Sequence, residues 1–227
     1  IYNSTNLYAS DYDVAAGIVA GSFGDLAEVV NTGGIYIQVY NNTGLDTLAA
    51  GIYAKGSYGG VVDNSGNISI SNNTNGSGDA TSWGIFAGDF GGAAAIESTV
   101  YNEGVINITS STDAGDVDAF GIKTLAAYEA EITNFGDVTI STSSNSGDAI
   151  AYGLAADSTL GNATVYNYAG ITVSTSSQAG DATAVGLEAR ALKYAYVYNT
   201  GDITASSESV TGDSASTGII SDGLFDG

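Results

Sequence analysis

Cysteine, histidine and methionine are absent from this 227-residue sequence, and arginine occurs once. Without cysteine the chain has neither disulfides nor thiolate metal sites. With no histidine and one arginine, a catalytic site that needs a cationic base or a clamp for a sugar carboxylate has almost no side chains to use. Carboxylates are plentiful, but they recur with the repeat described below, whereas a catalytic pair for glycoside hydrolysis occurs once, in a cleft. We therefore predict that the chain is not an enzyme.

Positive charge is equally scarce. Twenty-five acidic residues give a net charge of −21 against only four basic residues, which are Lys55, Lys123, Arg190 and Lys193. Such a surface repels nucleic acid and anionic lipid, so we expect no nucleic-acid partner. No run of 18 apolar residues is present, and we expect no membrane insertion of this segment. Because the chain begins with Ile1 and lacks methionine, we expect that it is not the primary translation product and that any signal peptide has been removed.

What the sequence does contain is a repeat. Copies of a pattern like VYNYAGITVSTS, at residues 165–176, recur along the whole chain and align on an asparagine. The spacings between successive asparagines are 28, 33, 38, 32, 33 and 32 residues. We interpret residues 1–227 as a single repeat domain in which the repeats begin near residues 1, 29, 62, 100, 132, 165 and 197.

Each repeat predicts β-strands. A β-branched residue stands two positions before the asparagine, aliphatic residues follow four and six positions after it, and polar residues lie between them. This alternation of period two is typical of a strand with one buried face. Farther along, each repeat has a glycine followed by an aliphatic residue, as at Gly121-Ile122. Each repeat therefore carries two strands and a third that leads into the next copy, and the fold class is all-β.

Seven such units bury their apolar faces only by stacking on one another. Stacking in register predicts a parallel β-helix, or β-solenoid, of about seven coils of about 33 residues, right-handed by the general tendency of parallel crossovers. A division of each repeat into two shorter coils is the alternative. A propeller ranks lower, because it needs four antiparallel strands per blade.

The asparagine at the bend of each repeat predicts a structural ladder. Asparagine tolerates turn conformations, and in a stack its side-chain amide can pass hydrogen bonds from coil to coil. The predicted members of this ladder are Asn31, Asn64, Asn102, Asn134, Asn167 and Asn199.

Repeats of the form V-x-N-x-G-x-I, then Ser/Thr, then G-D-A-x-x-x-G-I, resemble those of large surface-exposed β-helical proteins of Gram-negative bacteria, namely autotransporter passengers and filamentous-haemagglutinin-like adhesins. The resemblance covers nearly the whole chain and is best over residues 100–227. It implies a place outside the cell or on the bacterial cell surface, and a role as an adhesin or a fibre.

An aspartate stands five residues before the glycine in six of the seven glycine–aliphatic pairs described above. We interpret this row of aspartates, with the neighbouring Asp118, as a candidate metal site. In a stack these like charges would lie about 5 Å apart, and a divalent cation would relieve their repulsion. Ca²⁺ is the one candidate cofactor, although a solvated turn in which each aspartate bonds local backbone N–H groups is the favoured explanation of the row. The candidate ligands are Asp46, Asp79, Asp116, Asp118, Asp148, Asp181 and Asp213.

Two further rows are candidate interaction faces. Polar residues beyond the asparagine form a ladder of hydroxyls that includes Thr139, Thr172 and Thr204; such a face is typical of solvated strands and also resembles ice-binding or glycan-contact surfaces. Tyrosines one position before the asparagine, at Tyr2, Tyr101, Tyr166 and Tyr198, offer stacking planes with a hydroxyl, although stacking along the row that covers the strand edges is the favoured role.

Other features vary from repeat to repeat. An aromatic row at Trp83, Phe120 and Tyr152 precedes the glycines, and the sequence does not assign it to either face. Residues 71–78 and 90–97 are expected to be loops that leave the coil, where specific contacts often lie.

Together these patterns predict a secreted or cell-surface solenoid with a structural or adhesive role. Its expected partners are other copies of itself, in head-to-tail or lateral assembly into a filament, or glycans and proteins of a host or neighbouring cell. The alternative is a ligand-binding solenoid that takes Ca²⁺ on the aspartate row, or ice or glycan on the Ser/Thr face.

Overall fold

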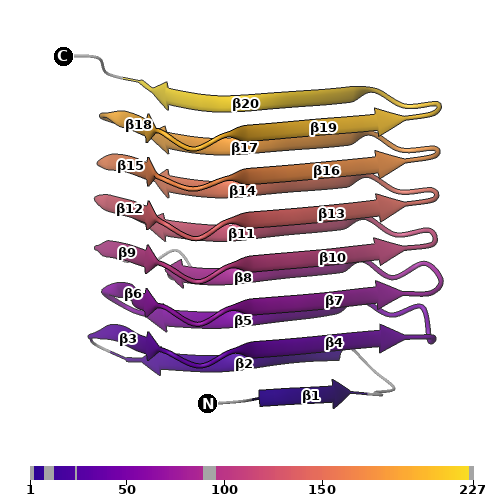
Figure 1. Cartoon of the computed structure of the whole chain (residues 1–227), viewed down its shortest axis with the longest axis horizontal. Coiled ribbons are helices and arrows are strands. Elements are labelled where there is room, and N and C mark those ends of the chain that lie inside the picture. The colour runs from indigo at the N-terminus through magenta and orange to yellow at the C-terminus, as the bar shows by residue number, and fades with distance from the viewer. Residues whose placement is uncertain (1–2, 8–12, 24, 89–95, 225–227) are drawn as a thin grey trace.

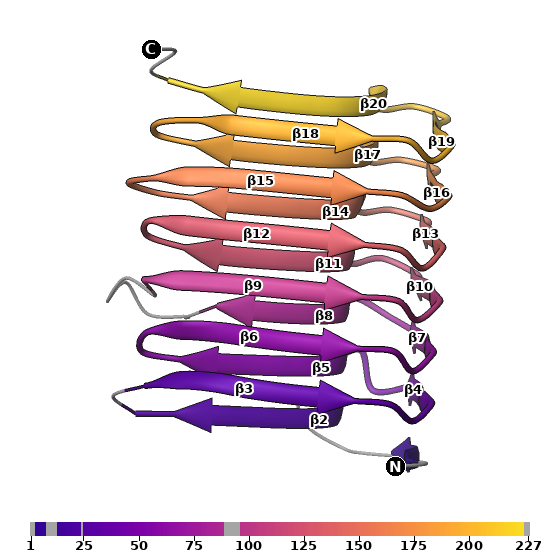
Figure 2. The same ribbon diagram turned by 60° about the vertical axis from the view of Figure 1, so that its left-hand side comes forward.

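The computed structural model describes residues 3–7, 13–23, 25–88 and 96–224, and all regular structure in this part of the chain is β-strand. The strands form three parallel sheets that wind around one core (Figures 1 and 2). Two sheets of seven strands and one of six give a parallel β-solenoid of about six turns, close to the predicted seven. The all-β class and the parallel solenoid are confirmed, and each turn takes three strands.

Sheet A carries the strand that follows each asparagine and lies toward the viewer in Figure 1. Its strands are β1 (Asn3–Leu7), β4 (Ile35–Asn41), β7 (Ile68–Thr74), β10 (Ile106–Thr112), β13 (Val138–Ser144), β16 (Ile171–Ser177) and β19 (Ile203–Ser209).

Sheet B carries the strand that contains each glycine–aliphatic pair. Its strands are β2 (Asp13–Ser22), β5 (Thr47–Gly56), β8 (Ala80–Gly88), β11 (Val117–Ala126), β14 (Ala149–Ser158), β17 (Ala182–Ala191) and β20 (Ser214–Gly223).

Sheet C completes each turn with the strand that ends at the asparagine. Its strands are β3 (Leu26–Asn31), β6 (Gly59–Asn64), β9 (Glu97–Asn102), β12 (Glu129–Asn134), β15 (Asn162–Asn167) and β18 (Ala195–Asn199).

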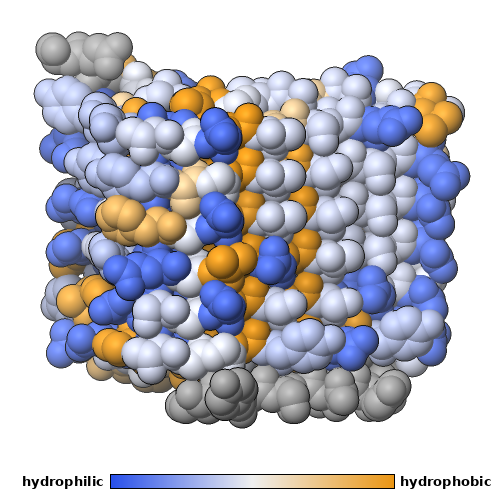
Figure 3. All heavy atoms as spheres, viewed as in Figure 1, coloured by the Kyte–Doolittle hydropathy of each residue, from blue (hydrophilic) through white to orange (hydrophobic). Residues whose placement is uncertain are grey.

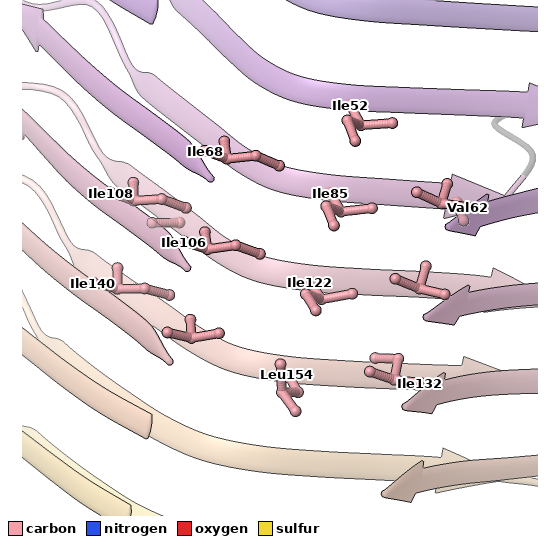
Figure 4. Packing of buried hydrophobic residues seen from close by; sticks show 14 of the residues in the cluster. Ile52, Val62, Ile68, Ile85, Ile106, Ile108, Ile122, Ile132, Ile140 and Leu154 are labelled. Carbon is pink, nitrogen blue, oxygen red and sulfur yellow. The ribbon is translucent and has the colours of Figure 1, made fainter. Parts of the chain in front are cut away.

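Register between coils places like residues over like. Ile106 of β10 pairs with Ile68 on one side and Val138 on the other, and the next inward residue, Ile108, pairs with Ile70 and Ile140. On sheet B, Ile52, Ile85, Ile122 and Leu154 form one column of the core (Figure 4). The core is thus a set of aliphatic columns, and Figure 3 shows corresponding stripes of one hydropathy on the outer surface.

The first repeat is an exception to the expected register. Alignment on the asparagine predicts Asn3 in line with Asn31, but β1 pairs with β4 so that Asn3 lies opposite Ile35 and Leu7 opposite Val39. Distance to the glycine explains the shift. Asn31 precedes Gly51 by 20 residues, whereas Asn3 precedes Gly17 by only 14, which is too few to span a full strand of sheet A and the corner that follows.

The prediction of a loop at residues 71–78 is also wrong for about half of that segment. Residues 71–74 belong to β7, and only residues 75–79 connect it to β8. The polar composition that suggested a loop reflects a strand whose last inward residues, Asn72 and Thr74, are polar yet buried. Most of the other expected loop, residues 90–97, lies outside the described residues, and Glu97 begins β9.

Each glycine in the middle of a sheet B strand lets the backbone and an aliphatic side chain of the next coil approach closely. We call this contact point the seat. A Cβ on Gly153 would lie 2.4 Å from the carbonyl oxygen of Gly186 and 2.5 Å from Cγ2 of Ile171. Gly51, Gly84, Gly121 and Gly186 meet the same pair of neighbours one coil along. The row therefore needs glycine for close approach, because any side chain would separate the coils.

We expect Gly153→Ala to destabilise the fold by about 1–3 kcal/mol through overpacking. Gly218 is the matched control, since a Cβ there meets nothing within 4 Å. Gly218→Ala should change stability by no more than about 0.5 kcal/mol. Urea denaturation followed by circular dichroism measures both, and equal losses for the two variants would refute the seat.

Candidate functional site

The asparagine row forms a continuous ladder through the stack. Nδ2 of Asn31 donates to Oδ1 of Asn64 at 2.7 Å, and the same bond links each later asparagine to its successor at 2.7–2.8 Å, as far as Asn199. Each Nδ2 also donates to the carbonyl two residues ahead, such as Gly136 O from Asn134. Asn31, Asn64, Asn102, Asn134 and Asn167 are buried. The ladder therefore fixes the bend between sheets C and A, and its role is structural.

Removal of one member from the middle of the ladder should be costly. Asn134→Ala deletes two donated hydrogen bonds and removes one of the two acceptors of Nδ2 of the buried Asn102, which keeps only Gly104 O. We expect a loss of about 3 kcal/mol, from the lost bonds and one unsatisfied buried N–H.

Asn199→Ala is the control, because Asn199 is only partly buried and water can replace its contacts. That variant should lose about 1 kcal/mol. The free energies of unfolding in urea compare the two, and a smaller loss for Asn134→Ala than for Asn199→Ala would exclude a cooperative ladder.

The aspartate row lies at the corner between sheets A and B. The backbone N–H of each aspartate donates to Oδ1 of the aspartate one coil earlier, as from Asp148 N to Asp116 Oδ1 and from Asp181 N to Asp148 Oδ1, both at 2.8 Å. The same bond joins Asp46 to Asp79, Asp79 to Asp116 and Asp181 to Asp213. One oxygen of each carboxylate except that of Asp213 is therefore occupied by the next coil.

A metal site is not assembled in this row. Within the described ranges, no three or more acidic side chains come close enough to hold a metal ion. Asp118, the seventh candidate ligand, is not part of the row, because it lies on the outward side of β11 and pairs in register with Thr81 and Ile150.

The three candidate threonines lie together. Thr139, Thr172 and Thr204 occupy successive coils of sheet A in direct register, and all are exposed. The same outward row continues into Asn107, Ser69 and Tyr36. This face is a broad polar surface on the side seen in Figure 3, with residue types that change toward the first coils.

The candidate tyrosines do not stack on one another. Tyr101, Tyr166 and Tyr198 share a row, but Thr133 separates the first two. Their rings contact other aromatics: Tyr101 lies 5.4 Å from Phe135, and Tyr198 lies 5.8 Å from Tyr168, between ring centroids. Tyr166 contacts Tyr196 at 5.9 Å. Tyr2 lies outside the described residues.

Sequence reasoning missed the column that these contacts complete. Phe135 and Tyr168 follow the ladder asparagines, and their rings stack at 4.6 Å with an angle of 7°. Tyr101, Phe135, Tyr168 and Tyr198, here called the aromatic column, are exposed by 38%, 45%, 43% and 41%. The signal was available as the residue immediately after each asparagine, but a phenylalanine or tyrosine occurs there only twice.

The outward side of sheet B holds further aromatic and basic residues. Trp83, Phe120 and Tyr152 point away from the core there, and Phe120 stacks on Tyr152 at 5.0 Å. Lys123 lies 4.3 Å above the Phe120 ring and 3.6 Å from Oδ2 of Asp157. Farther along, Nη2 of Arg190 lies 2.8 Å from Oε1 of Glu188.

Among the described residues, Asp118, Glu131 and Glu188 have carboxyl groups with raised pKa values. Burial is the main cause for each; the nearby Asp116 adds to it for Asp118, Glu129 adds to it for Glu131, and Arg190 partly opposes it for Glu188. In each case the folded-state pKa exceeds the unfolded-state value, so the folded chain binds more protons in the window between them. Stability from these groups is therefore full below the unfolded-state pKa and is lost as the pH rises through the folded-state pKa.

We predict that acidification from pH 7 toward pH 5 raises the thermal midpoint. Glu188→Gln should make the midpoint less dependent on pH, because it removes one buried ionisable group. Glu208→Gln, on the exposed face of sheet A, removes the same charge without a buried carboxylate and should keep the wild-type dependence. Thermal melts at a series of pH values test this, and an unchanged slope in Glu188→Gln would contradict it.

Comparison with known proteins gives no relative for this chain: no protein-family model, no curated protein and no solved structure matches it. Within the described residues, no helix is long and apolar enough to cross a membrane. The side chains exposed on the three sheets therefore carry the evidence for the function of this chain.

Proposed function

We propose that this chain is a secreted or cell-surface rod with a structural and adhesive role, which presents repeated faces to neighbouring copies or to other surfaces. The aromatic column is the observation that carries this proposal. It offers four partly exposed rings on four consecutive coils, and exposed tyrosine and phenylalanine are enriched at protein contacts. Because the rings repeat along the stack, several weak contacts can form at once and reinforce each other.

The last described coil has an edge that either a further coil of a longer chain or a second copy of this chain would cover. Strands β18, β19 and β20 each pair on one side only within the described part of the chain (Figure 1). The inward Ile219 is 47% exposed, and the seat at Gly218 is empty. A further coil with an isoleucine and a glycine in register would cover both, and unpaired strand edges readily accept such a partner.

The repeat pattern supports a location outside the cell, through its resemblance to bacterial surface β-helices. The acidic surface, with a net charge of −21, favours solubility at high local concentration. A rod of stacked coils also needs no ligand to hold its shape, since its core columns and ladders are internal.

Aggregation of beads coated with the purified chain tests the proposal. We expect wild-type beads to aggregate and Phe135→Ser/Tyr168→Ser beads to aggregate at least about tenfold less, since two anchor rings are lost from each copy. Thr139→Ser/Thr172→Ser, on the polar face of sheet A, is the control and should aggregate like wild type.

Negative-stain microscopy of the same chain should show rods longer than the roughly 34 Å of one seven-strand stack. Wild-type beads that stay dispersed, together with single short rods at all concentrations, would refute the structural and adhesive role.

A further inference from the structure

The outward side of sheet B bends at the middle of its strands. At the middle of each strand two consecutive residues, such as Gly121 and Ile122, face inward and are buried. The outward residues on either side of this bend therefore converge, which brings Lys123 over Phe120 and places the rings of Trp83 and Phe86 5.3 Å apart. Five outward side chains at the bend are at most 3% exposed: Ala50, Phe86, Ala155, Val185 and Glu188. We call this surface the sheet B groove.

The sheet B groove differs from every ladder in the molecule because its rows do not repeat. Successive coils carry Ala50, Trp83, Phe120, Tyr152 and Val185 before the glycine, and Tyr53, Phe86, Lys123, Ala155 and Glu188 after the bend. Stacking needs only like residues over like, so it does not account for this variation. All four basic residues of the chain also lie on sheet B strands or within two residues of one: Lys55, Lys123, Arg190 and Lys193. The outward residues of sheet B therefore differ from coil to coil, and a binding site built from them would occur once in the chain.

The half of the groove toward β20 combines a ring platform with charged groups. Tyr152 is half-buried there, and burial together with the nearby Glu188 raises the pKa of its hydroxyl. Arg190 lies in register between Asp157 and Asp222. Asp157, Arg190 and Asp222 line a hollow of about 220 Å³ together with Ser158, Leu192 and Leu224. That volume is smaller than a site for a drug-sized ligand and suits one unit of a longer chain.

Glu188 has an unmet hydrogen-bonding need. It is 3% exposed although it points away from the core, and its Oε1 lies beside Arg190 but receives no aligned hydrogen bond. Oε1 is therefore partnered by the charge of Arg190 but by no aligned N–H, and a carboxylate oxygen in that state can still accept a hydrogen bond. A ligand that brings hydroxyl donors into the groove would supply the missing bond.

Charge selects the class of ligand. The groove holds the acids Asp118, Asp157, Glu188 and Asp222 against the bases Lys123 and Arg190, each of which already has a carboxylate within 3.6 Å. An anionic polymer would therefore be repelled, and an apolar peptide would leave these charges without solvent or partners. A polymer of uncharged sugars fits both features, because its hydroxyls donate to carboxylates and its ring carbons pack against aromatic side chains.

We propose that the sheet B groove binds an uncharged glycan chain laid along the solenoid axis. Tyr152 and Phe120 contact the apolar surfaces of the sugar rings, and Glu188 and Asp157 accept hydrogen bonds from sugar hydroxyls. Arg190 donates to ring or hydroxyl oxygens in the adjoining hollow. This site deepens the adhesive role proposed above, since it names a glycan as one surface to which the rod attaches.

Isothermal titration calorimetry with cellohexaose, xylohexaose and chitohexaose tests the site. We expect saturable binding of at least one of these neutral hexasaccharides with one site per chain, and no binding of the anionic hexagalacturonate. The single tryptophan, Trp83, lies in the same groove and gives a second readout through its fluorescence.

Variants separate the groove from the other faces. Tyr152→Ala and Glu188→Gln should each weaken binding by about tenfold or more, the cost of one ring contact or one charged hydrogen bond. Tyr152→Phe keeps the ring that contacts the sugar, so it is the matched control for Tyr152→Ala and should bind like wild type. Thr139→Ala/Thr172→Ala on sheet A should bind like wild type.

Three results would overturn the proposal: no saturable binding of any of the neutral hexasaccharides, wild-type affinity in Glu188→Gln and Tyr152→Ala, or equal loss in the sheet A variant. None of these would refute the structural and adhesive role, because bead aggregation depends on the aromatic column. Conversely, dispersed beads with intact hexasaccharide binding would refute that role and leave the glycan site in place.

Discussion

Parallel pairing in register between neighbouring coils is the constraint on which the rest of this molecule depends. It places Ile106 between Ile68 and Val138, and Asn134 between Asn102 and Asn167. A side chain in such a stack meets its own kind above and below, so aliphatic residues build columns, amides build hydrogen-bonded ladders and glycines let backbones approach. A large apolar centre is unnecessary, and many core positions are filled by alanine.

The same constraint explains which features the sequence predicts well. Rows that stack must be chemically alike, so the Val-x-Asn, Ile-x-Ile and Gly-Ile patterns recur at one spacing and reveal strands, bends and the parallel solenoid. The asparagine and aspartate rows are visible for the same reason, although their partners are not. The sequence alone leaves open whether Asp148 meets a cation or a backbone N–H, and the structure places the N–H of Asp181 on its Oδ1.

Features that depend on a break in the period-two alternation of a strand could not be predicted from the sequence. A period-two pattern assigns alternate residues to alternate faces, but Gly121 and Ile122 both face inward, so the pattern loses its phase at the bend. For this reason the face of Trp83, Phe120 and Tyr152 could not be read from the sequence, and neither could the burial of Glu188 on an outward position. The displaced first strand and the aromatic column escape for related reasons, since one depends on strand length and the other on diagonal contacts between rows.

The molecule thus has two kinds of surface, one whose residues repeat from coil to coil and one whose residues do not. The ladders and the polar face of sheet A repeat from coil to coil and suit multivalent contact, whereas the sheet B groove collects the residues that differ between coils, including the few basic ones. Outward positions accommodate such variation without altering the aliphatic columns of the core. The bend at the glycine row provides those positions, because it turns a flat sheet face into a groove with buried walls.

Cross-linking of engineered cysteines tests the register most directly, since the chain has no cysteine of its own. Thr139 and Thr172 are exposed register partners, and in-register parallel strands lie about 4.8 Å apart, within the span of a disulfide. Thr139→Cys/Thr172→Cys should form an intramolecular disulfide rapidly and nearly completely under mild oxidation. Thr139→Cys/Ser176→Cys, displaced by four residues along the strand, should not. Equal cross-linking of both pairs, or none in the first, would contradict a column in which residues one repeat apart are superposed.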